Sequence, residues 1–331
     1  MPRIVRLHAF GGPEDLRIDE LPSSTPGPGE ARVCVEAVGL GRDQFAYLAG
    51  RRYSGLDLDE KDLPLRLGYE VAGVVDAVGS GVDEAWIGKR VAPVSPFDES
   101  RYGCYGEEGI VPAELLWEYP GSLTPAQAAA FWVPYGTAYG LVGCVQVGDV
   151  VALPAASSAV GAAALQIVRD AGAFSIATTR SARKVDELRA RGADHVIVTD
   201  GEDYVARIME ITAGRGADVT FDPIGGNFLT QAAAASALGG TIIAYGILAG
   251  EAARFPQELV IGHALTIRGY TVGQVVADPV KRGEAIAFFE PRLSDGRFVP
   301  SVAATFGLED FVAGYAEVDA NSTMGRVIVQ P

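Results

Sequence analysis

The apolar positions along this chain follow two different patterns. Through the first third, short alternating runs of apolar and polar residues are separated by Gly and Pro, which is typical of β-strands joined by turns. From about Thr124 the pattern changes to continuous apolar runs that alternate with Ala-rich helical stretches. The first pattern predicts an all-β, barrel-like lobe, and the second predicts an α/β lobe with a doubly wound parallel sheet.

The predicted elements can be placed along the chain. In the first lobe we expect strands over 4–7, 31–38 and 69–78, with turns at 24–29 and 79–82. In the second lobe we expect strands over 150–153, 174–178, 195–198, 218–222 and 241–245. A further strand over 265–270, a helix over 281–292 and a final strand over 325–329 complete the chain, and we expect the final strand to return to the first lobe.

Residues 150–168 read as an apolar strand, a turn of small residues and a helix. Such a turn lets backbone N–H groups and the positive end of a helix approach a pyrophosphate. Where dinucleotide sites have Gly-x-Gly-x-x-Gly, this chain has Ala156, Ser158 and Gly161, so the turn alone fits an ordinary strand–helix connection equally well. The helix pattern stops at Gly172, a C′ glycine, and the strand after it completes a βαβ unit.

The end of the second strand of this unit carries cations. NAD enzymes place an acid there against the ribose 2′-hydroxyl, whereas NADP enzymes place cations against the 2′-phosphate. Arg180 stands at the strand end and Lys184 one turn into the following helix, with Ser181 as a cap or further donor, while the first acid, Asp186, comes too late. A solvated helix face is the alternative for such a run, but its place beside the turn favours NADP(H).

Composition restricts the possible partners. A chain of 331 residues with 48% hydrophobic residues predicts two domains of a soluble protein, and with no signal-peptide pattern or membrane-spanning apolar run we expect it to be cytoplasmic. Cys34, Cys104 and Cys144 are too widely separated for a disulfide framework or a zinc knuckle. The net charge of −15 disfavours nucleic acids and membrane surfaces as partners. The partner that we expect instead is a small-molecule acceptor.

Short motifs lie at 39–44, 67–75, 134–139, 156–161, 221–226, 268–271 and 325–327. In this order and at these separations, they resemble the medium-chain dehydrogenase/reductase superfamily and, within it, the zinc-free quinone oxidoreductase-like branch. The resemblance covers essentially the whole chain. It implies a GroES-like β-barrel domain and a Rossmann domain with the cofactor in the cleft, arranged as 1–123 (first part of the catalytic domain), 124–267 (NADP(H)-binding domain) and 268–331 (return to the catalytic domain).

The chain departs from the zinc alcohol dehydrogenases of this superfamily at their metal positions. Those enzymes hold the catalytic metal with a Cys, a Gly-His-Glu and a later Cys, and the matching positions here are Gly41, Tyr69 beside Glu70, and Val133. A catalytic zinc requires thiolate and imidazole donors, which a single Glu cannot replace. The four-cysteine structural zinc lobe is also missing, so we expect no metal.

The reaction expected without a Lewis acid is reduction of an electron-poor acceptor. A quinone or an α,β-unsaturated carbonyl can take a hydride, which leaves negative charge on an oxygen that needs hydrogen-bond donors and a proton. Tyr53 and Tyr69 are the candidate catalytic donors, because a phenol is neutral near pH 7. The alternative for both is an aromatic cleft wall, and Asp43 and Gln44 are expected to be structural hydrogen-bonders.

The resemblance also implies a set of cofactor-binding residues. Thr137, Asn321 and Gly225 each have a plain structural alternative, as a helix hydroxyl, a turn residue and a turn glycine. The set comprises Thr137 at the nicotinamide ribose; Ser158, Ala159 and Val160 at the pyrophosphate; Thr179, Arg180 and Lys184 at the adenosine end; Gly225, Tyr245, Gly246, Tyr270 and Thr271 near the nicotinamide; and Asn321, which would close over the site.

The sequence therefore predicts an NADPH-dependent, zinc-independent oxidoreductase for quinones or activated enones. Two alternatives stay open: an enoyl-thioester reductase or alcohol dehydrogenase of the same superfamily, and a noncatalytic NADP(H)-binding protein. By resemblance we also expect a homodimer that uses the strand over 265–270 as a sheet edge.

Overall fold

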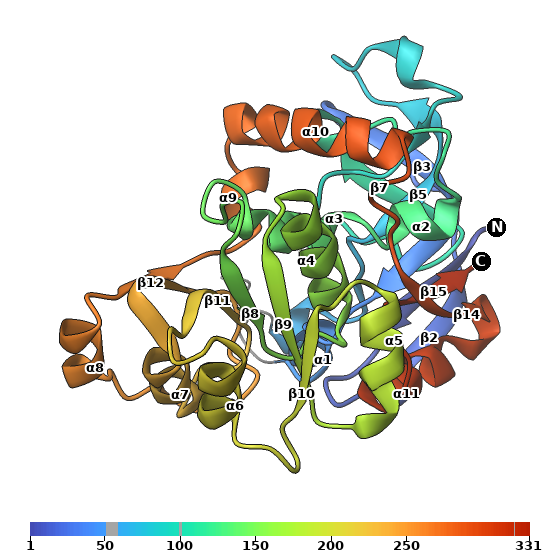
Figure 1. Cartoon of the computed structure of the whole chain (residues 1–331). Helices are drawn as coiled ribbons and strands as arrows, with labels where there is room; N and C mark the ends of the chain where they lie inside the picture. The colour runs from blue at the N-terminus through green and yellow to red at the C-terminus, as the bar shows by residue number, and fades with distance from the viewer. Residues whose placement is uncertain (51–58, 99–100, 321) are drawn as a thin grey trace. The chain divides into compact units, whose positions relative to one another are not determined.

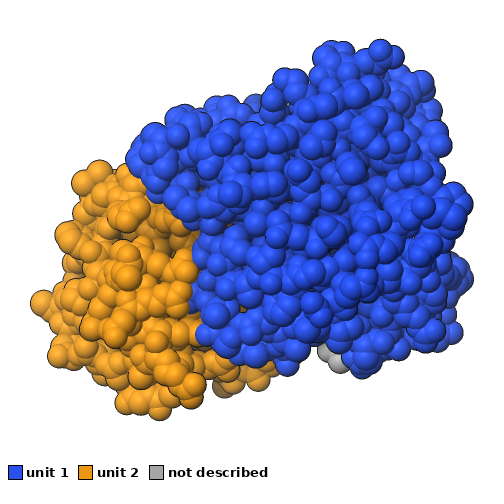
Figure 2. Space-filling view, turned by 90° about the vertical axis from the view of Figure 1, so that its right-hand side faces the viewer, with its two compact units in different colours: residues 1–133, 275–331 blue, residues 134–274 orange. Residues whose placement is uncertain are grey.

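The computed structural model describes residues 1–50, 59–98, 101–320 and 322–331. The chain divides into two compact units, shown in Figure 2: unit 1 contains Met1–Val133 and Val275–Pro331, and unit 2 contains Pro134–Gln274. This division and the domain ranges expected from the sequence assign only residues 124–133 and 268–274 differently. Tyr53 and Asn321 lie outside the described residues.

Unit 1 is built on a mostly antiparallel sheet in the order β14-β15-β3-β5-β6, with β7 also paired to β3. A smaller sheet has the order β2-β1-β4. The last strand, β15, pairs with β3 in the first lobe, as the sequence pattern predicts. The strands are β1 (Arg3–Leu7), β2 (Leu16–Glu20), β3 (Glu30–Leu40), β4 (Leu65–Arg66), β5 (Val71–Val78), β6 (Arg90–Val91), β7 (Glu108–Pro112), β14 (Val302–Gly307) and β15 (Arg326–Gln330).

Helix α2 explains why residues 124–133 join unit 1. It begins at a capping box, in which Thr124 Oγ1 accepts the N–H of Gln127 at 3.2 Å and Gln127 Oε1 accepts the N–H of Thr124 at 3.0 Å. The helix then packs against β3 and β5. The helices here are α1 (Gln44–Leu48), α2 (Pro125–Ala129), α10 (Pro279–Ser294) and α11 (Phe311–Ala320), the 3₁₀ turns η1 (Pro13–Asp15), η2 (Glu60–Asp62), η3 (Glu84–Trp86), η4 (Ala113–Leu115) and η7 (Leu308–Asp310), and at the unit boundaries α3 (Trp132–Ala138) and α9 (Gly273–Val276).

Aromatic side chains fill one part of the core of unit 1. The Phe131 ring stacks on Trp117 with centroids 5.2 Å apart and meets Phe289 of α10 edge-on at 5.1 Å. The indole N–H of buried Trp132 donates to the carbonyl of Ala92 at 3.1 Å. These contacts join α10, from the late part of the chain, to the first lobe, so both segments share one core.

Unit 2 contains a six-stranded parallel sheet in the order β10-β9-β8-β11-β12-β13 (Figure 1). With β8 counted as the first strand, this is the 3-2-1-4-5-6 order of a Rossmann fold, so the predicted doubly wound sheet is confirmed. The elements are β8 (Val150–Leu153), β9 (Phe174–Thr179), β10 (His195–Val198), β11 (Ala217–Asp222), β12 (Ser236–Ala244), β13 (Thr266–Gly269), α4 (Ala159–Asp170), α5 (Val185–Ala190), α6 (Tyr204–Ile211), α7 (Phe228–Ala234), α8 (Gln257–Gly262), η5 (Tyr139–Leu141) and η6 (Ala182–Lys184).

The strand order of unit 2 positions a ligand site. The order in which strands are added reverses at β8: β9 and β10 lie on one side of it, and β11, β12 and β13 lie on the other. Ligands of doubly wound sheets bind at the carboxyl ends of the strands at such a point. Helix α4 follows β8 and ends as predicted: Gly172 has φ +72°, and the N–H of Ala173 donates to the carbonyl of Val168 at 3.1 Å.

None of the helices in the described part of the chain combines the length and the apolar character that crossing a membrane requires.

Candidate functional site

The turn between β8 and α4 is fixed by capping rather than by several glycines. Ser158 is the N-cap of α4, and its Oγ accepts the N–H of Gly161 at 3.0 Å. A Cβ at Gly161 would lie 2.4 Å from the carbonyl oxygen of Ala156, so only glycine allows this close approach. Ala155 has the left-handed φ of +52°, and the N–H of Ala156 donates to Thr178 on β9 at 3.0 Å.

The start of α4 fits an anion. The N–H groups in the first turn of a helix have no hydrogen-bond acceptor within the helix. Because Ser158 accepts the N–H of Gly161, the remaining N–H groups of this kind in α4 are those of Ala159 and Val160. Ser158 accepts one hydrogen bond, and a hydroxyl in that role can still donate its own hydrogen. The helix is 12 residues long and starts at the carboxyl end of β8, so its dipole also favours negative charge there.

The carboxyl end of β9 presents one accessible cation among the predicted residues. Arg180 directly follows β9 and is exposed. Thr179 is buried and its Oγ1 accepts the N–H of Ser181 at 3.3 Å, while Ser181 caps η6 by accepting the N–H of Arg183 at 3.4 Å. Lys184 is only 8% exposed and is the last residue of η6, rather than lying one turn inside an α-helix. Arg180 is therefore the better placed of the two predicted cations.

A buried aspartate organises the loop after β11. Asp222 is fully buried; its Oδ1 accepts the N–H of Ile224 at 2.7 Å and that of Gly225 at 3.1 Å, and burial raises the pKa of its carboxyl group against the effect of these donors. Gly225 has φ +66°, which explains the glycine. Tyr245 follows β12; its N–H donates to Asp222 O at 2.9 Å and its ring stacks on Phe221 with centroids 4.0 Å apart.

The four residues predicted to flank the nicotinamide follow two neighbouring strands. Tyr245 and Gly246 follow β12, and Tyr270 and Thr271 follow β13, which pairs in parallel with β12 through Ala244 and Gly269. A Cβ at Gly246 would lie 2.6 Å from the carbonyl oxygen of Pro223. The Tyr270 hydroxyl donates to Gly136 O at 2.7 Å, Thr271 is exposed, and Thr137 is buried within α3. The parallel pairing of β12 with β13 thus places Tyr245, Gly246, Tyr270 and Thr271 together at the carboxyl ends of these two strands.

A buried charged cluster lies at the ends of three neighbouring strands of unit 1. The Tyr69 hydroxyl donates to Asp43 Oδ2, and the Arg326 guanidinium donates to Glu70 Oε2 in a buried ion pair. Tyr69 and Glu70 directly precede β5, Asp43 follows β3, and Arg326 begins β15. Because β3 pairs in antiparallel fashion with both β5 and β15, the four side chains come from the same edge of the sheet. We refer to these four residues as the acid cluster.

Burial dominates the electrostatics of the acid cluster. It raises the pKa of Glu70 to about 7, opposed by Arg326 and reinforced by Asp43. Burial also raises the pKa of Asp43, although Arg326 opposes this shift. Burial lowers the pKa of Arg326, but Glu70 and Asp43 outweigh it, so the guanidinium stays charged. Within the described part of the chain, Glu70 Oε1 and Arg326 Nε have no hydrogen-bond partner, which is unusual for buried polar atoms.

The sequence motifs contained these four residues but did not show that they belong together. Arg326 was part of a closing motif without an assigned role, and Asp43 was expected to be structural. Position 41 is the link: a Cβ at Gly41 would lie 2.2 Å from Asp43 Oδ1 and 3.0 Å from Arg326 Nη1. A glycine two positions before Asp43 is therefore the local signal that could have indicated a close approach.

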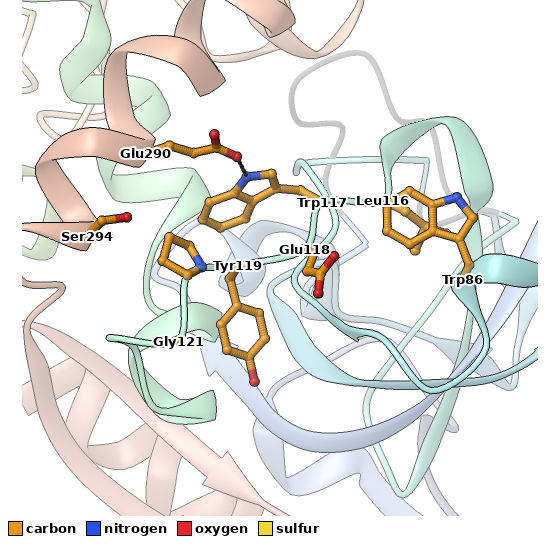
Figure 3. A pocket seen from close by; sticks show the side chains of 9 residues that line it. Trp86, Leu116, Trp117, Glu118, Tyr119, Gly121, Glu290 and Ser294 are labelled. Carbon is orange, nitrogen blue, oxygen red and sulfur yellow. Dashed lines mark hydrogen bonds between the residues drawn. The ribbon is translucent and has the colours of Figure 1, made fainter.

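A groove in unit 1 lies apart from the predicted site residues. In Figure 3 the Trp117 indole N–H points toward Glu290, to whose Oε1 it donates at 3.0 Å. The groove contains none of the predicted catalytic or cofactor-binding residues within the described chain. Its lining residues are Trp86, Leu116, Trp117, Glu118, Tyr119, Pro120, Gly121, Glu290 and Ser294.

Two family models match consecutive parts of the chain. The model described as alcohol dehydrogenase GroES-like domain matches residues 27–154, and the one described as zinc-binding dehydrogenase matches residues 159–289. The chain belongs to the medium-chain dehydrogenase/reductase superfamily. It is quinone oxidoreductase-like within this family of oxidoreductases, and the predicted combination of a GroES-like and a Rossmann domain is confirmed.

Three members of the family cover nearly the whole chain. A 2-haloacrylate reductase of Burkholderia sp. is 28% identical over 332 residues, covering 98% of this chain and 98% of its own. The structure of a quinone oxidoreductase from Pseudomonas syringae pv. Tomato DC3000 matches with a TM-score of 0.88 and 26% identity, covering 100% of both chains. A mycobacterial protein solved in complex with NADPH matches with a TM-score of 0.87 and 25% identity, also over 100% of both chains.

The metal positions of the zinc-dependent family members do not fit a zinc ion in this chain. Gly41 has no donor atom, the Tyr69 hydroxyl is bonded to Asp43, and Val133 is apolar. Glu70 is paired with Arg326 instead. In residues 1–50, 59–98, 101–320 and 322–331, no group of three or more His, Cys, Asp or Glu side chains could hold a metal. A thiolate and imidazole donor set is thus replaced by an ion pair and a phenol–carboxyl pair.

Glu70→Gln should flatten the pH dependence of stability. The Glu70 pKa is about 7 in the folded chain against 4.5 in the unfolded chain, so the folded state holds this proton longer and the free energy of unfolding falls as pH rises through that window. Gln cannot titrate, so the stability difference between parent and variant should shift by roughly 3 kcal/mol between these pH values. Urea unfolding at several pH values measures it; Glu114→Gln, at an exposed position, is the control. Parallel pH curves for parent and E70Q would show that Glu70 titrates normally.

Proposed function

We propose that the protein is an NADPH-dependent, zinc-independent oxidoreductase that transfers a hydride to a quinone or an α,β-unsaturated carbonyl acceptor. The observation that carries the proposal is the exposed Arg180 at the carboxyl end of β9. This strand is the direct neighbour of β8, whose following turn has the form of a pyrophosphate-binding turn. A cation there matches the 2′-phosphate of NADPH, and an acid would match the ribose of NADH instead. The NADPH complex of a mycobacterial relative supports the cofactor.

Each part of the cofactor has a proposed set of binding residues in unit 2. Ala159 and Val160 would donate main-chain N–H groups to the pyrophosphate, with Ser158 as a further donor. Arg180 would pair with the 2′-phosphate; Thr179 and Lys184 would line the adenosine end as buried side chains. The remaining proposed contacts near the nicotinamide are Thr137, Gly225, Tyr245, Gly246, Tyr270 and Thr271, and Asn321 remains a prediction outside the described residues.

Bound NADPH would supply the hydride, and the protein's part is to orient the acceptor and handle charge and protons. Tyr53 and Tyr69 are the proton donors proposed from the sequence; Tyr53 lies outside the described residues. Tyr69 is 3% exposed and its hydroxyl is committed to Asp43, so it acts through that carboxyl group. The names of two relatives, a 2-haloacrylate reductase and a quinone oxidoreductase, support an electron-poor acceptor as the substrate class.

An acceptor panel tests the reaction. We expect NADPH oxidation with a quinone or an enone, and none with an NADP⁺ and primary alcohol pair, because Gly41, Tyr69 and Val133 do not supply the thiolate and imidazole donors that a catalytic zinc requires. A chelator should leave the rate unchanged, and metal analysis should find no zinc. Faster turnover of an enoyl thioester or of an alcohol would assign the protein to those classes instead. Tight NADPH binding without turnover of any acceptor would indicate a noncatalytic protein.

Arg180→Ala should weaken NADPH binding by roughly tenfold to a hundredfold and leave NADH binding nearly unchanged, because one charge-assisted bond to the 2′-phosphate is lost. Cofactor fluorescence titration measures both dissociation constants. Arg189→Ala, which removes a charge from the exposed end of α5, is the matched control. Equal losses for NADPH and NADH in R180A would contradict the proposed role of Arg180.

We also propose a homodimer that pairs through β13. This strand is the last of the parallel sheet and has one described neighbour, β12. Large exposed apolar side chains gather on the elements next to it: Leu238 of β12 is 81% exposed and Ile261 of α8 is 70% exposed. The Gly239 N–H donates to His263 O at 2.7 Å, which joins these two elements. Edge strands with apolar flanks are suited to pairing with a second copy.

Ile261→Lys should shift the protein toward the monomer, because a charge would be buried at the proposed interface. Sedimentation velocity over a range of concentrations measures the assembly. Val147→Lys is the control, since Val147 is 84% exposed but precedes β8 in the middle of the sheet. A parent chain that sediments as a monomer throughout, or an I261K variant that remains dimeric, would argue against this interface.

A further inference from the structure

We propose that Asp43 is the catalytic residue that gives the proton to the reduced acceptor, and that Tyr69, Glu70 and Arg326 are positioning residues that hold it. The inference rests on the proposed function, because only an acceptor that has gained a hydride needs this proton. Asp43 is half-buried, whereas Tyr69, Glu70 and Arg326 are all buried. Among the four residues of the acid cluster, Asp43 is thus the least buried.

The charge count of the acid cluster calls for a proton. Two carboxyl groups, Asp43 and Glu70, share a single guanidinium, that of Arg326. With both carboxyl groups ionised, the cluster would carry one uncompensated negative charge in buried surroundings, which is costly. One bound proton makes it neutral. Tyr69 and Tyr105, the other titratable groups that face the cluster, are neutral phenols near neutral pH.

The two carboxyl oxygens of Asp43 have different surroundings. Oδ2 accepts the Tyr69 hydroxyl, and Oδ1 lies over the bare Cα of Gly41. A Cβ at this glycine would come within 2.2 Å of Oδ1, so the position of Oδ1 depends on position 41 having no side chain. The buried Arg326–Glu70 pair fixes the other side of this space, since Arg326 Nη1 would lie 3.0 Å from the same Cβ.

The proposed step moves one proton from Asp43 to the reduced acceptor. The acceptor first takes two electrons and a hydrogen as hydride, which leaves negative charge on its oxygen. The O–H bond of protonated Asp43 breaks, a new O–H bond forms on the acceptor, and Asp43 is left as a carboxylate. The Tyr69 hydroxyl and the charge of Arg326 stabilise that carboxylate. A proton from solvent then restores the acid.

Asp43→Asn should lower kcat for a quinone or enone by about 100-fold, within the range for loss of a general acid, and leave KM and the NADPH dissociation constant unchanged. Asn keeps the shape of the side chain but cannot supply a proton. The solvent deuterium isotope effect on kcat should increase in the variant, since protonation becomes limiting. Asp310→Asn, at an exposed position of the same unit, is the control. An active parent and an equally active D43N variant would overturn the proposal.

Gly41→Ala tests the position of Asp43 without removing it. The added methyl group must displace Asp43 Oδ1, so we expect the kcat loss of D43N in a chain that still contains the aspartate. Circular dichroism and NADPH binding show whether this variant is folded. A folded G41A variant with the turnover of the parent would contradict the proposed placement.

Infrared spectroscopy of the cofactor-free protein provides a readout that does not depend on turnover. At slightly acidic pH, the carbonyl band of a protonated carboxyl group should be present in the parent and reduced in D43N. If the band is unchanged in D43N, Asp43 does not hold the proton and the proposal fails, whatever the acceptor panel shows. If none of the acceptors in the panel supports NADPH oxidation by the parent, the proposed function fails. In that case, a carbonyl band that is lost in D43N still supports Asp43 as the group that holds the proton.

Discussion

The ion pair between Arg326 and Glu70 is the interaction on which the site of unit 1 depends. It joins the first residue of β15 to the residue before β5, across the intervening strand β3, and both side chains are buried. Loss of one partner from such a pair costs about 3–5 kcal/mol, because the other charge stays buried without compensation. The late strand β15 therefore does more than complete a sheet: it brings the only charge that neutralises the carboxyl groups at this edge within the described cluster.

The two units use different chemistry to build a site, and this difference decided what could be predicted. In unit 2 the groups that matter are mainly backbone N–H groups at the end of β8 and the start of α4, which depend on small residues at fixed spacing. That information is local, so the βαβ unit, the Gly172 helix end and the doubly wound parallel sheet could be predicted from periodicity and turn residues. Gly161 is needed because a Cβ at this position would lie only 2.4 Å from the carbonyl oxygen of Ala156 in the same turn.

The acid cluster of unit 1 is made by contacts between distant residues, which no local pattern encodes. Tyr69 and Asp43 are 26 positions apart, and Arg326 and Glu70 are 256 apart. The sequence contained all four in recognisable motifs, but the pairing of β3 with both β5 and β15 was needed to show that they meet. The burial of individual side chains could not be predicted from the sequence either. The same run of cations contains Arg180, which is exposed, and Lys184, which is buried.

The turn before α4 also bears on the thermodynamics of ligand binding. Ala156 and Ser158 stand where other dinucleotide-binding turns place glycines, Ala155 just before them has a left-handed φ, and a capping bond at 3.0 Å holds the geometry. Alanine and serine restrict the unfolded chain, which offsets part of the strain of a left-handed alanine. The conformational entropy of ordering this loop is thus lost during folding rather than on binding, so at the proposed pyrophosphate site a ligand would meet a turn whose geometry is already set.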